Sequence, residues 1–377
     1  MLEVRHKELE KILRQVWEAR LPLYIWGSPG IGKSQTVREF AERLAKERGR
    51  QFFDWTKSTE EEKKAVLKNP EKYFIFRDIR LSEYDPSDLR GLPNFEKETS
   101  FVIWKSPLWI EVITNPRIEG VVFFDEMNLA PPAVLKSAYE IILDRSINDK
   151  KISDGILIIG AGNRSTDGAQ VTIMPRPLQN RFLHVVLKIP TAEEFSQYAT
   201  QRGIDPRITA FLLARPSFIF KMPESEEEAS FPTPRQWEFA SKLIKKLPDD
   251  EAGRYIALAV GEAVAFEFNA FLRLKRKIDF KQILENPKKA SEVIKEDDID
   301  LKYALVSLCY DYYRSKPSPE RIKKIVDIME QFDKEFLMLT LRMIVSGEKR
   351  GLEDLDKALT KYPHLSEMAR VLNKYLE

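Results

Sequence analysis

A glycine-rich segment near the N-terminus constrains the fold more than any other part of the chain. Residues 27–34 read Gly-Ser-Pro-Gly-Ile-Gly-Lys-Ser, which satisfies the spacing G-x-x-x-x-G-K-[ST] and holds three of the chain's 15 glycines. The segment follows a short apolar run, Leu23–Trp26, that suits a strand, and precedes Ser34–Arg48, which has helical periodicity. Glycines in this context let several backbone N–H groups point at one anion, so the pattern predicts a phosphate-binding loop.

Such a loop predicts a bound nucleoside triphosphate, expected to be ATP with Mg²⁺, although the sequence does not distinguish ATP from GTP. Lys33 is expected to contact the β and γ phosphates and Ser34 to ligate the metal. The residues assigned to nucleotide binding are those of the loop and the residue after it: Gly27, Ser28, Pro29, Gly30, Ile31, Gly32, Lys33, Ser34 and Gln35.

Two carboxylates follow the continuous apolar run Val121–Phe124, which is too short for a helix and suits a strand buried on both faces of a parallel sheet. Beside a phosphate loop, Asp125 is expected to hold the magnesium together with Ser34, and Glu126 to polarise the attacking water. Without that loop, an Asp-Glu pair at a strand end would more often be a solvated edge.

A second buried strand, Gly155–Ala161, leads to Asn163. The amide of Asn163 is a candidate to contact the γ-phosphate or the lytic water. Taken alone, it would more often be a turn-forming residue.

Three arginines are candidates to stabilise the charge that develops on a transferred phosphoryl group. Arg181 closes a short helix before a predicted strand over Leu183–Ile189, and Arg176 lies shortly upstream as an alternative. Arg235 stands at a predicted helix start in the C-terminal half. Each of them singly would more often be a surface residue.

Composition excludes several other kinds of site. The single cysteine, Cys309, and three scattered histidines cannot form a disulfide framework or a Cys/His metal cluster. With 61 Lys and Arg against 59 Asp and Glu, the net charge of +2 gives no argument for nucleic acid or membrane binding. Because no segment reads as a signal peptide or a membrane span, the expected location is the cytoplasm.

Periodicity divides the chain into an α/β part and a helical part. Strands are expected at Leu23–Trp26, Tyr73–Ile79, Val121–Phe124, Gly155–Ala161 and Leu183–Ile189, with helices at His6–Ala19, Ser34–Arg48, Thr59–Lys68 and Pro131–Ile147. This alternation predicts a parallel α/β nucleotide-binding core over residues 1–190. Only helical periodicity follows, which suggests an all-helical lid over 191–275 and a helical extension over 276–377.

The order of these motifs resembles that of the AAA+ ATPases, with the match spread over residues 20–240. Residues 125–130 (Asp-Glu-Met-Asn-Leu-Ala), residues 84–93 (Tyr-Asp-Pro-Ser-Asp-Leu-Arg-Gly-Leu-Pro) and the pair Arg181-Phe182 resemble the MoxR branch. That branch inserts two β-hairpins, expected here within Asp85–Trp104 and Ser146–Gly155. Asn180 departs from the family, which often has an acidic residue before the arginine.

The resemblance implies a ring, usually a hexamer, in which each ATP lies between subunits and Arg181 acts on the neighbour's nucleotide. It also implies sensor roles for Asn163 and Arg235, a protein-remodelling activity, and a partner with a von Willebrand factor A domain. One alternative is a nucleic-acid motor or a restriction-associated NTPase of the McrB type, suggested by residues 163–167 (Asn-Arg-Ser-Thr-Asp). Another is a ring scaffold that hydrolyses nucleotide slowly, against which the intact Glu126 argues.

Overall fold

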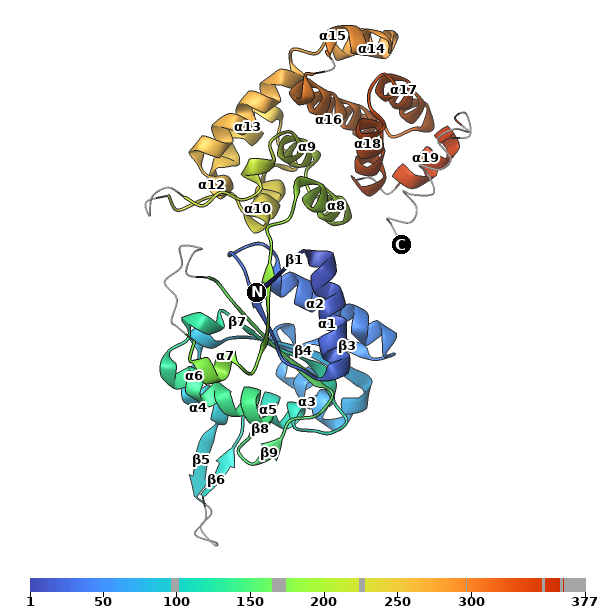
Figure 1. The fold of residues 1–377 in the computed structure, drawn as a ribbon. Helices are drawn as coiled ribbons and strands as arrows, with labels where there is room; N and C mark the ends of the chain where they lie inside the picture. The colour runs from blue at the N-terminus through green and yellow to red at the C-terminus, as the bar shows by residue number, and fades with distance from the viewer. Residues whose placement is uncertain are drawn as a thin grey trace. The chain divides into compact units, whose positions relative to one another are not determined.

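The computed structural model describes residues 1–95, 102–164, 174–223, 228–295, 297–347, 350–359 and 362. The chain divides into two compact units, Met1–Ile189 and Pro190–Glu377, and Figure 1 shows the elements of each.

The first unit alternates strands and helices. Its elements are β1 (Leu2–Val4), α1 (His6–Ala19), β2 (Leu23–Trp26), α2 (Lys33–Glu47), β3 (Gln51–Asp54), α3 (Glu60–Lys68), β4 (Tyr73–Arg80), α4 (Pro86–Arg90), β5 (Leu92–Phe95), β6 (Val102–Lys105), α5 (Leu108–Ile113), β7 (Glu119–Asp125), α6 (Pro132–Tyr139), β8 (Ser146–Ile147), β9 (Lys150–Lys151), β10 (Ile156–Gly162), α7 (Arg176–Gln179) and β11 (Leu183–Leu187).

Seven of these strands form one parallel sheet in the order β1-β11-β2-β10-β7-β4-β3. Helix α2 packs on β3, β4 and β7, while α3, α5 and α6 share a hydrophobic core with the opposite face. The central strands β7 and β10 are apolar and almost fully buried because both faces are covered. The sheet therefore confirms the predicted parallel α/β core.

All five predicted strands are present, but the sequence analysis missed both edges of the sheet, β1 and β3. In β1 only Val4 is buried, and in β3 only Phe53 is. An edge strand covered on one side carries no apolar run, so periodicity gives it no signal. Pairing with β11 and β4 is what makes these segments strands.

The predicted helix Pro131–Ile147 is too long. Helix α6 ends at Tyr139 and a π-helical turn continues to Asp144, after which Arg145 takes a left-handed conformation with φ of 48°. The Arg145 guanidinium donates hydrogen bonds to the carbonyls of Ser153 (2.9 Å) and Ile156 (2.8 Å). These contacts with residues beyond the turn stop the helix, and no local pattern announces them.

Both predicted β-hairpins are present. Strands β5 and β6 pair antiparallel between α4 and α5, and β8 pairs antiparallel with β9 before β10. The part of the first insert at residues 96–101 lies outside the described residues.

The second unit is helical, as predicted from Thr191 onward. Its helices are α8 (Ala192–Arg202), α9 (Pro206–Ala214), α10 (Pro234–Ile244), α11 (Asp249–Tyr255), α12 (Ala257–Val260), α13 (Glu262–Lys275), α14 (Phe280–Glu285), α15 (Lys289–Val293), α16 (Ile299–Ser315), α17 (Pro319–Met329), α18 (Lys334–Gly347) and α19 (Gly351–Leu359).

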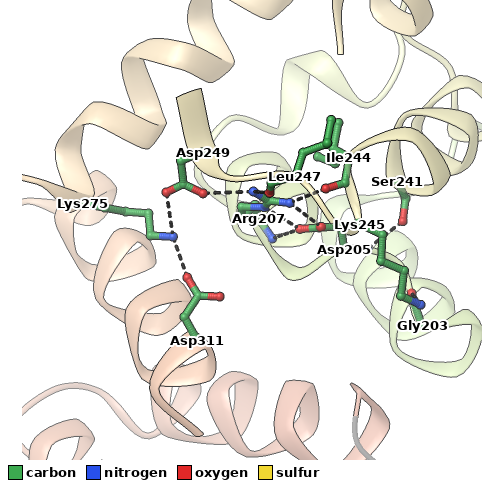
Figure 2. A network of polar contacts seen from close by, with 10 residues as sticks. All are labelled: Gly203, Asp205, Arg207, Ser241, Ile244, Lys245, Leu247, Asp249, Lys275 and Asp311. Atoms are coloured by element: carbon green, nitrogen blue, oxygen red, sulfur yellow. Dashed lines mark hydrogen bonds and ion pairs between the residues drawn. The ribbon is translucent and has the colours of Figure 1, made fainter. Parts of the chain in front are cut away.

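A network of charged side chains lies among the helices of this unit (Figure 2). The buried Arg207 guanidinium donates to both Asp205 oxygens (3.0 and 2.8 Å) and to Asp249 (3.0 Å). The Lys275 ammonium contacts Asp249 at 3.2 Å and Asp311 of α16 at 2.7 Å.

Apolar side chains of α8–α13 form one core and those of α14–α19 another. The division at residue 275 into lid and extension stays a prediction, and Lys275 bonds across it.

No helix in the described part of the chain is both long enough and apolar enough to span a membrane.

Candidate nucleotide-binding site

The glycine loop connects the carboxyl end of β2 to the start of α2, as predicted. Gly30 and Gly32 have φ of 72° and 100°, in the left-handed region that residues with a Cβ rarely adopt. Gly32 is the N-cap of α2, and the Ile31 side chain is buried. The loop is thus anchored by an apolar side chain at its tip and shaped by glycines on each side of it.

Lys33 bends back over the loop and is only 8% exposed. Its ammonium donates to the carbonyls of Gly27 (2.6 Å) and Ser28 (2.9 Å) and to the Asn163 side-chain oxygen (3.0 Å). These contacts hold a positive charge at the mouth of the loop, beside an amide from a different strand.

Ser34 and Asp125 meet although they are 91 residues apart. The Ser34 hydroxyl donates to Oδ2 of Asp125 at 2.6 Å, and the other Asp125 oxygen accepts from the Glu126 backbone N–H at 2.9 Å. A hydroxyl oxygen and a carboxylate oxygen in contact fit Mg²⁺, which takes oxygen ligands and uses few from the protein when phosphates supply others. These two side chains would hold the ion.

Glu126 lies directly after β7 in a left-handed conformation with φ of 51°, which is unusual for a residue with a side chain. One of its carboxylate oxygens accepts a long hydrogen bond (3.4 Å) from the hydroxyl of Ser82, which follows β4. A backbone outlier beside the phosphate loop is the kind of local strain that occurs at functional sites.

Asn163 is held by a side chain that the sequence analysis gave no role. The buried Asn128 amide donates to the Asn163 carbonyl at 2.7 Å, and its oxygen accepts from the Asn163 N–H at 3.3 Å. A Cβ on Gly162 would collide with the Asn128 amide and the Tyr24 hydroxyl, so glycine is required there. Asn128 thereby fixes the backbone from which the Asn163 side chain reaches Lys33.

A buried carboxylate missed by the sequence analysis lies on the neighbouring strand. Asp78 of β4 pairs in register with Phe123, two residues before Asp125. Burial, together with the nearby charge of Asp125, raises the pKa of Asp78 to about 6. Its Oδ1 atom is buried and has no hydrogen-bond partner among the described residues. A single Asp inside the apolar strand Tyr73–Ile79 was the available signal.

His6 contacts the loop, whereas Gln35 bonds within the helix that follows it. The His6 ring bonds through Nε2 to the Ile31 carbonyl at 2.9 Å, so α1 touches the tip of the loop. Gln35 donates to Glu39 one turn later on α2 at 2.7 Å. The sequence predicted a binding role for Gln35 and none for His6.

The two candidate arginines of the first unit, Arg176 and Arg181, have no described contact with the cluster. Arg181, in the turn between α7 and β11, is exposed, as is Arg176 at the start of α7. Within the described residues, neither guanidinium has a hydrogen bond or an ion pair. Arg235 is exposed near the start of α10, in the second unit. The roles of these arginines stay predictions.

The sheet order explains why the other side chains meet. Strand β10, which leads to Asn163, lies between β2, which leads to the loop, and β7, which ends in Asp125. The carboxyl ends of these parallel strands lie at one edge of the sheet, the usual position of a ligand site in an α/β fold. The Gly27 N–H donates to the Gly162 carbonyl at 3.2 Å and closes this edge. The first unit is therefore a parallel α/β fold in which the glycine loop, the acidic end of β7 and Asn163 share one edge of the sheet.

Several solved structures resemble this chain at low identity and with low TM-scores. For AMPPCP-bound DnaA from Aquifex aeolicus the identity is 14%, the coverage 96% of each chain and the TM-score 0.35. For the ORC2 protein of Aeropyrum pernix the identity is 11%, the coverage 90% of this chain and 92% of that one, and the TM-score 0.36. For a RuvB mutant from Thermotoga maritima the identity is 16%, the coverage 88% of this chain and 86% of that one, and the TM-score 0.32.

With identities and TM-scores this low, these likenesses transfer no residue roles to the α/β core described above. No protein-family model and no curated protein matches the chain.

Proposed function

We propose that this protein is a magnesium-dependent ATPase of the AAA+ type that works in a ring. The observation that carries the proposal is the convergence of Lys33, Ser34, Asp125 and Asn163 at adjacent strand ends, through hydrogen bonds of 2.6 to 3.0 Å. The four side chains come from three separate motifs, and together they supply a cation, two metal-ligand oxygens and an amide. This set suits a triphosphate better than any other ligand class.

The roles follow from the chemistry of each group. The Lys33 ammonium would leave the Gly27 and Ser28 carbonyls to bind the β and γ phosphates, joined by backbone N–H groups of the loop and by the α2 N-terminus. Magnesium, when bound, would neutralise phosphate charge, and Ser34 and Asp125 would hold it. The Glu126 carboxylate would accept a hydrogen bond from the attacking water, and the Asn163 amide would contact that water or the γ-phosphate.

Completion of the site from a second subunit is supported by the exposure of Arg181. An arginine with five N–H donors and no described partner is free to bind the γ-phosphate of a neighbouring molecule. Arg176, at the start of the short helix α7 that precedes the Arg181 turn, is the alternative. Arg235 is proposed as a sensor that reports the nucleotide to the helical unit.

A MoxR-like remodelling role is supported by the first hairpin, β5–β6. It carries three exposed apolar side chains, Leu92 (66%), Ile103 (47%) and Trp104 (41%), in an insert of the core. Exposed apolar residues on a projecting hairpin suit contact with a protein client. We propose a ring, of six subunits by the MoxR resemblance, acting on such a client with a von Willebrand factor A-domain partner.

The test is hydrolysis and binding with three purified forms of the full chain. The wild type should release phosphate from ATP only with Mg²⁺. Lys33→Ala should lose nucleotide binding, whereas Glu126→Gln should bind ATP with a similar Kd and turn over at least roughly a hundredfold more slowly.

Tight ATP binding by Lys33→Ala would exclude the loop as the site. Full turnover by Glu126→Gln would assign the base to another residue. A preference for GTP together with stimulation by DNA would favour the McrB-type alternative, whose residues Ser165–Asp167 lie outside the described part of the chain. Capture of a client by Glu126→Gln in host extract would then identify the substrate protein.

A further inference from the structure

The imidazole of His184 connects two segments of the first unit: the strand that leads into the phosphate loop and the end of α7, just before Arg181. The indole N–H of Trp26 donates to Nδ1 of His184 at 3.0 Å. On the other side of the ring, Nε2 lies 2.7 Å from the Gln179 carbonyl. Trp26 immediately precedes the phosphate loop, and Gln179 is the last residue of α7, two residues before Arg181.

The two partners define the protonation state of the ring. A tryptophan indole nitrogen only donates, so Nδ1 of His184 must carry the lone pair. A carbonyl only accepts, so Nε2 must carry the proton. Both conditions are met by one species, the neutral Nε2–H tautomer. A proton on Nδ1 would set two N–H donors against each other and break the bond to Trp26.

Packing keeps the imidazole in place between these partners. Its ring lies nearly parallel to that of Trp26, with an interplanar angle of 24°, and its centroid is 5.8 Å from that of Tyr24 and 6.5 Å from that of Phe182. Tyr24 is buried and its pKa is raised above the usual range, so this neighbour is uncharged. His184 also sits opposite Tyr24 in the β11–β2 pairing.

The carbonyl that His184 holds controls the turn carrying Arg181. It also accepts the Phe182 N–H at 3.2 Å, while the Arg181 N–H bonds to Leu178 one residue earlier. The Gln179 side chain donates to the Met174 carbonyl at 2.7 Å, which ties the other end of α7. A shift of the Gln179 carbonyl would therefore move the backbone of Arg181.

We propose that His184 is a positioning residue that fixes the Arg181 turn relative to the strand leading into the phosphate loop. This inference rests on the proposed function, since it assigns His184 to the arginine that acts on a neighbouring subunit's nucleotide. The contribution of His184 passes through the Trp26 and Gln179 hydrogen bonds.

The test is a double-mutant cycle on the ATPase of the assembled full-length protein. His184→Phe keeps an aromatic ring and removes both hydrogen bonds. It should lower kcat roughly tenfold, because a small displacement of a transition-state group costs rate, and leave the KM for MgATP within about twofold. In the Arg181→Ala background the same substitution should cause no further loss. His184→Asn, which keeps an acceptor near the Nδ1 position, should recover part of the rate.

Equal losses from His184→Phe with and without Arg181 would overturn the proposal, because the effect would then not pass through the arginine. A rise in the KM for MgATP that matches the loss of kcat in His184→Phe would also overturn the proposal. If the wild type hydrolyses no ATP under any condition, the proposed function fails first, and that result is distinct from an additive cycle in an active enzyme.

A spectroscopic arm tests the contact without turnover. Nitrogen-15 NMR of histidine-labelled, nucleotide-free protein at neutral pH should show one neutral Nε2–H ring whose Nδ1 resonance shifts in Trp26→Phe. An imidazolium or an Nδ1–H tautomer at His184 would contradict the proposed bridge.

Discussion

At the scale of single residues, the core places side chains by contacts that span most of its length. Lys33 reaches Asn163 across 130 positions, and Ser34 reaches Asp125 across 91. Asn128 bonds to both backbone groups of Asn163 and has no direct contact with the loop residues in the described hydrogen bonds. The precision of the site thus depends on buried amides and hydroxyls as well as on the motif residues themselves.

The Asp78 carboxylate provides a stability prediction at this scale. Because its folded pKa is about 6, above the ordinary value of 3.8, the folded protein binds this proton more tightly than the unfolded chain. Stability is therefore lost as pH rises from about 4 through about 6. In nucleotide-free protein, Asp78→Asn should raise the free energy of unfolding by about 2 kcal/mol at pH 8 and by about half as much at pH 5.

Urea denaturation of the two forms at both pH values measures this effect. Asp144→Asn, at an exposed carboxylate of the same unit, is a matched control and should show no such pH-dependent gain. A destabilised Asp78→Asn protein at pH 8 would mean that the ionised carboxylate is favourably bound by its surroundings.

At the scale of elements, the network around Lys275 joins three helices of the second unit. The Lys275 side chain is 5% exposed and lies between Asp249 at the start of α11 and Asp311 of α16. Burial alone would raise the pKa of Asp249, but Lys275 and Arg207 together lower it below its usual range. The stabilisation is therefore present above about pH 4 and is lost as the protein is acidified through the lowered pKa of Asp249.

Removing the ammonium should uncouple these helices. Lys275→Met keeps the length of the stem and should cost about 2 kcal/mol, less than for a fully buried pair because both partners are partly exposed. Asp311→Leu combined with it should cost less than the sum of the single changes. Urea denaturation followed by helical circular dichroism measures the cycle. Strict additivity would show that Lys275 and Asp311 do not stabilise each other.

At the scale of the whole molecule, the proposal of a shared site predicts complementation between subunits. Arg181→Ala and Glu126→Gln should each be nearly inactive alone. A mixture places an intact Glu126 opposite an intact Arg181 at some interfaces, so part of the ATPase should return. Steady-state phosphate release across mixing ratios measures this.

Mixing Lys33→Ala with Glu126→Gln is the matched control: every nucleotide site in that mixture lacks either Lys33 or Glu126, so no activity should return. If Arg181→Ala and Glu126→Gln together stay inactive while ring assembly is intact, Arg181 does not act on the neighbour's nucleotide. Repeating the mixture with Arg176→Ala then tests the alternative arginine.

The sequence predicted those parts of the fold that local pattern determines. The glycine loop between Leu23–Trp26 and its helix, the apolar strands before Asp125 and Asn163, and the helical second half follow from spacing and periodicity, whereas both hairpins were expected from the family resemblance. The features that follow from spacing and periodicity need only near neighbours along the chain, because buried parallel strands are continuously apolar and glycines permit left-handed turns.

Tertiary structure alone decided the edge strands, the end of α6 and the partners of the site. β1 becomes a strand by pairing with residues 183 positions away, and Asn128, Asp78 and His184 gain their roles from segments that no local pattern connects to them. Chain composition limits which groups are available, but their protonation states and orientations depend on burial and on hydrogen bonds that form only when distant strands lie side by side.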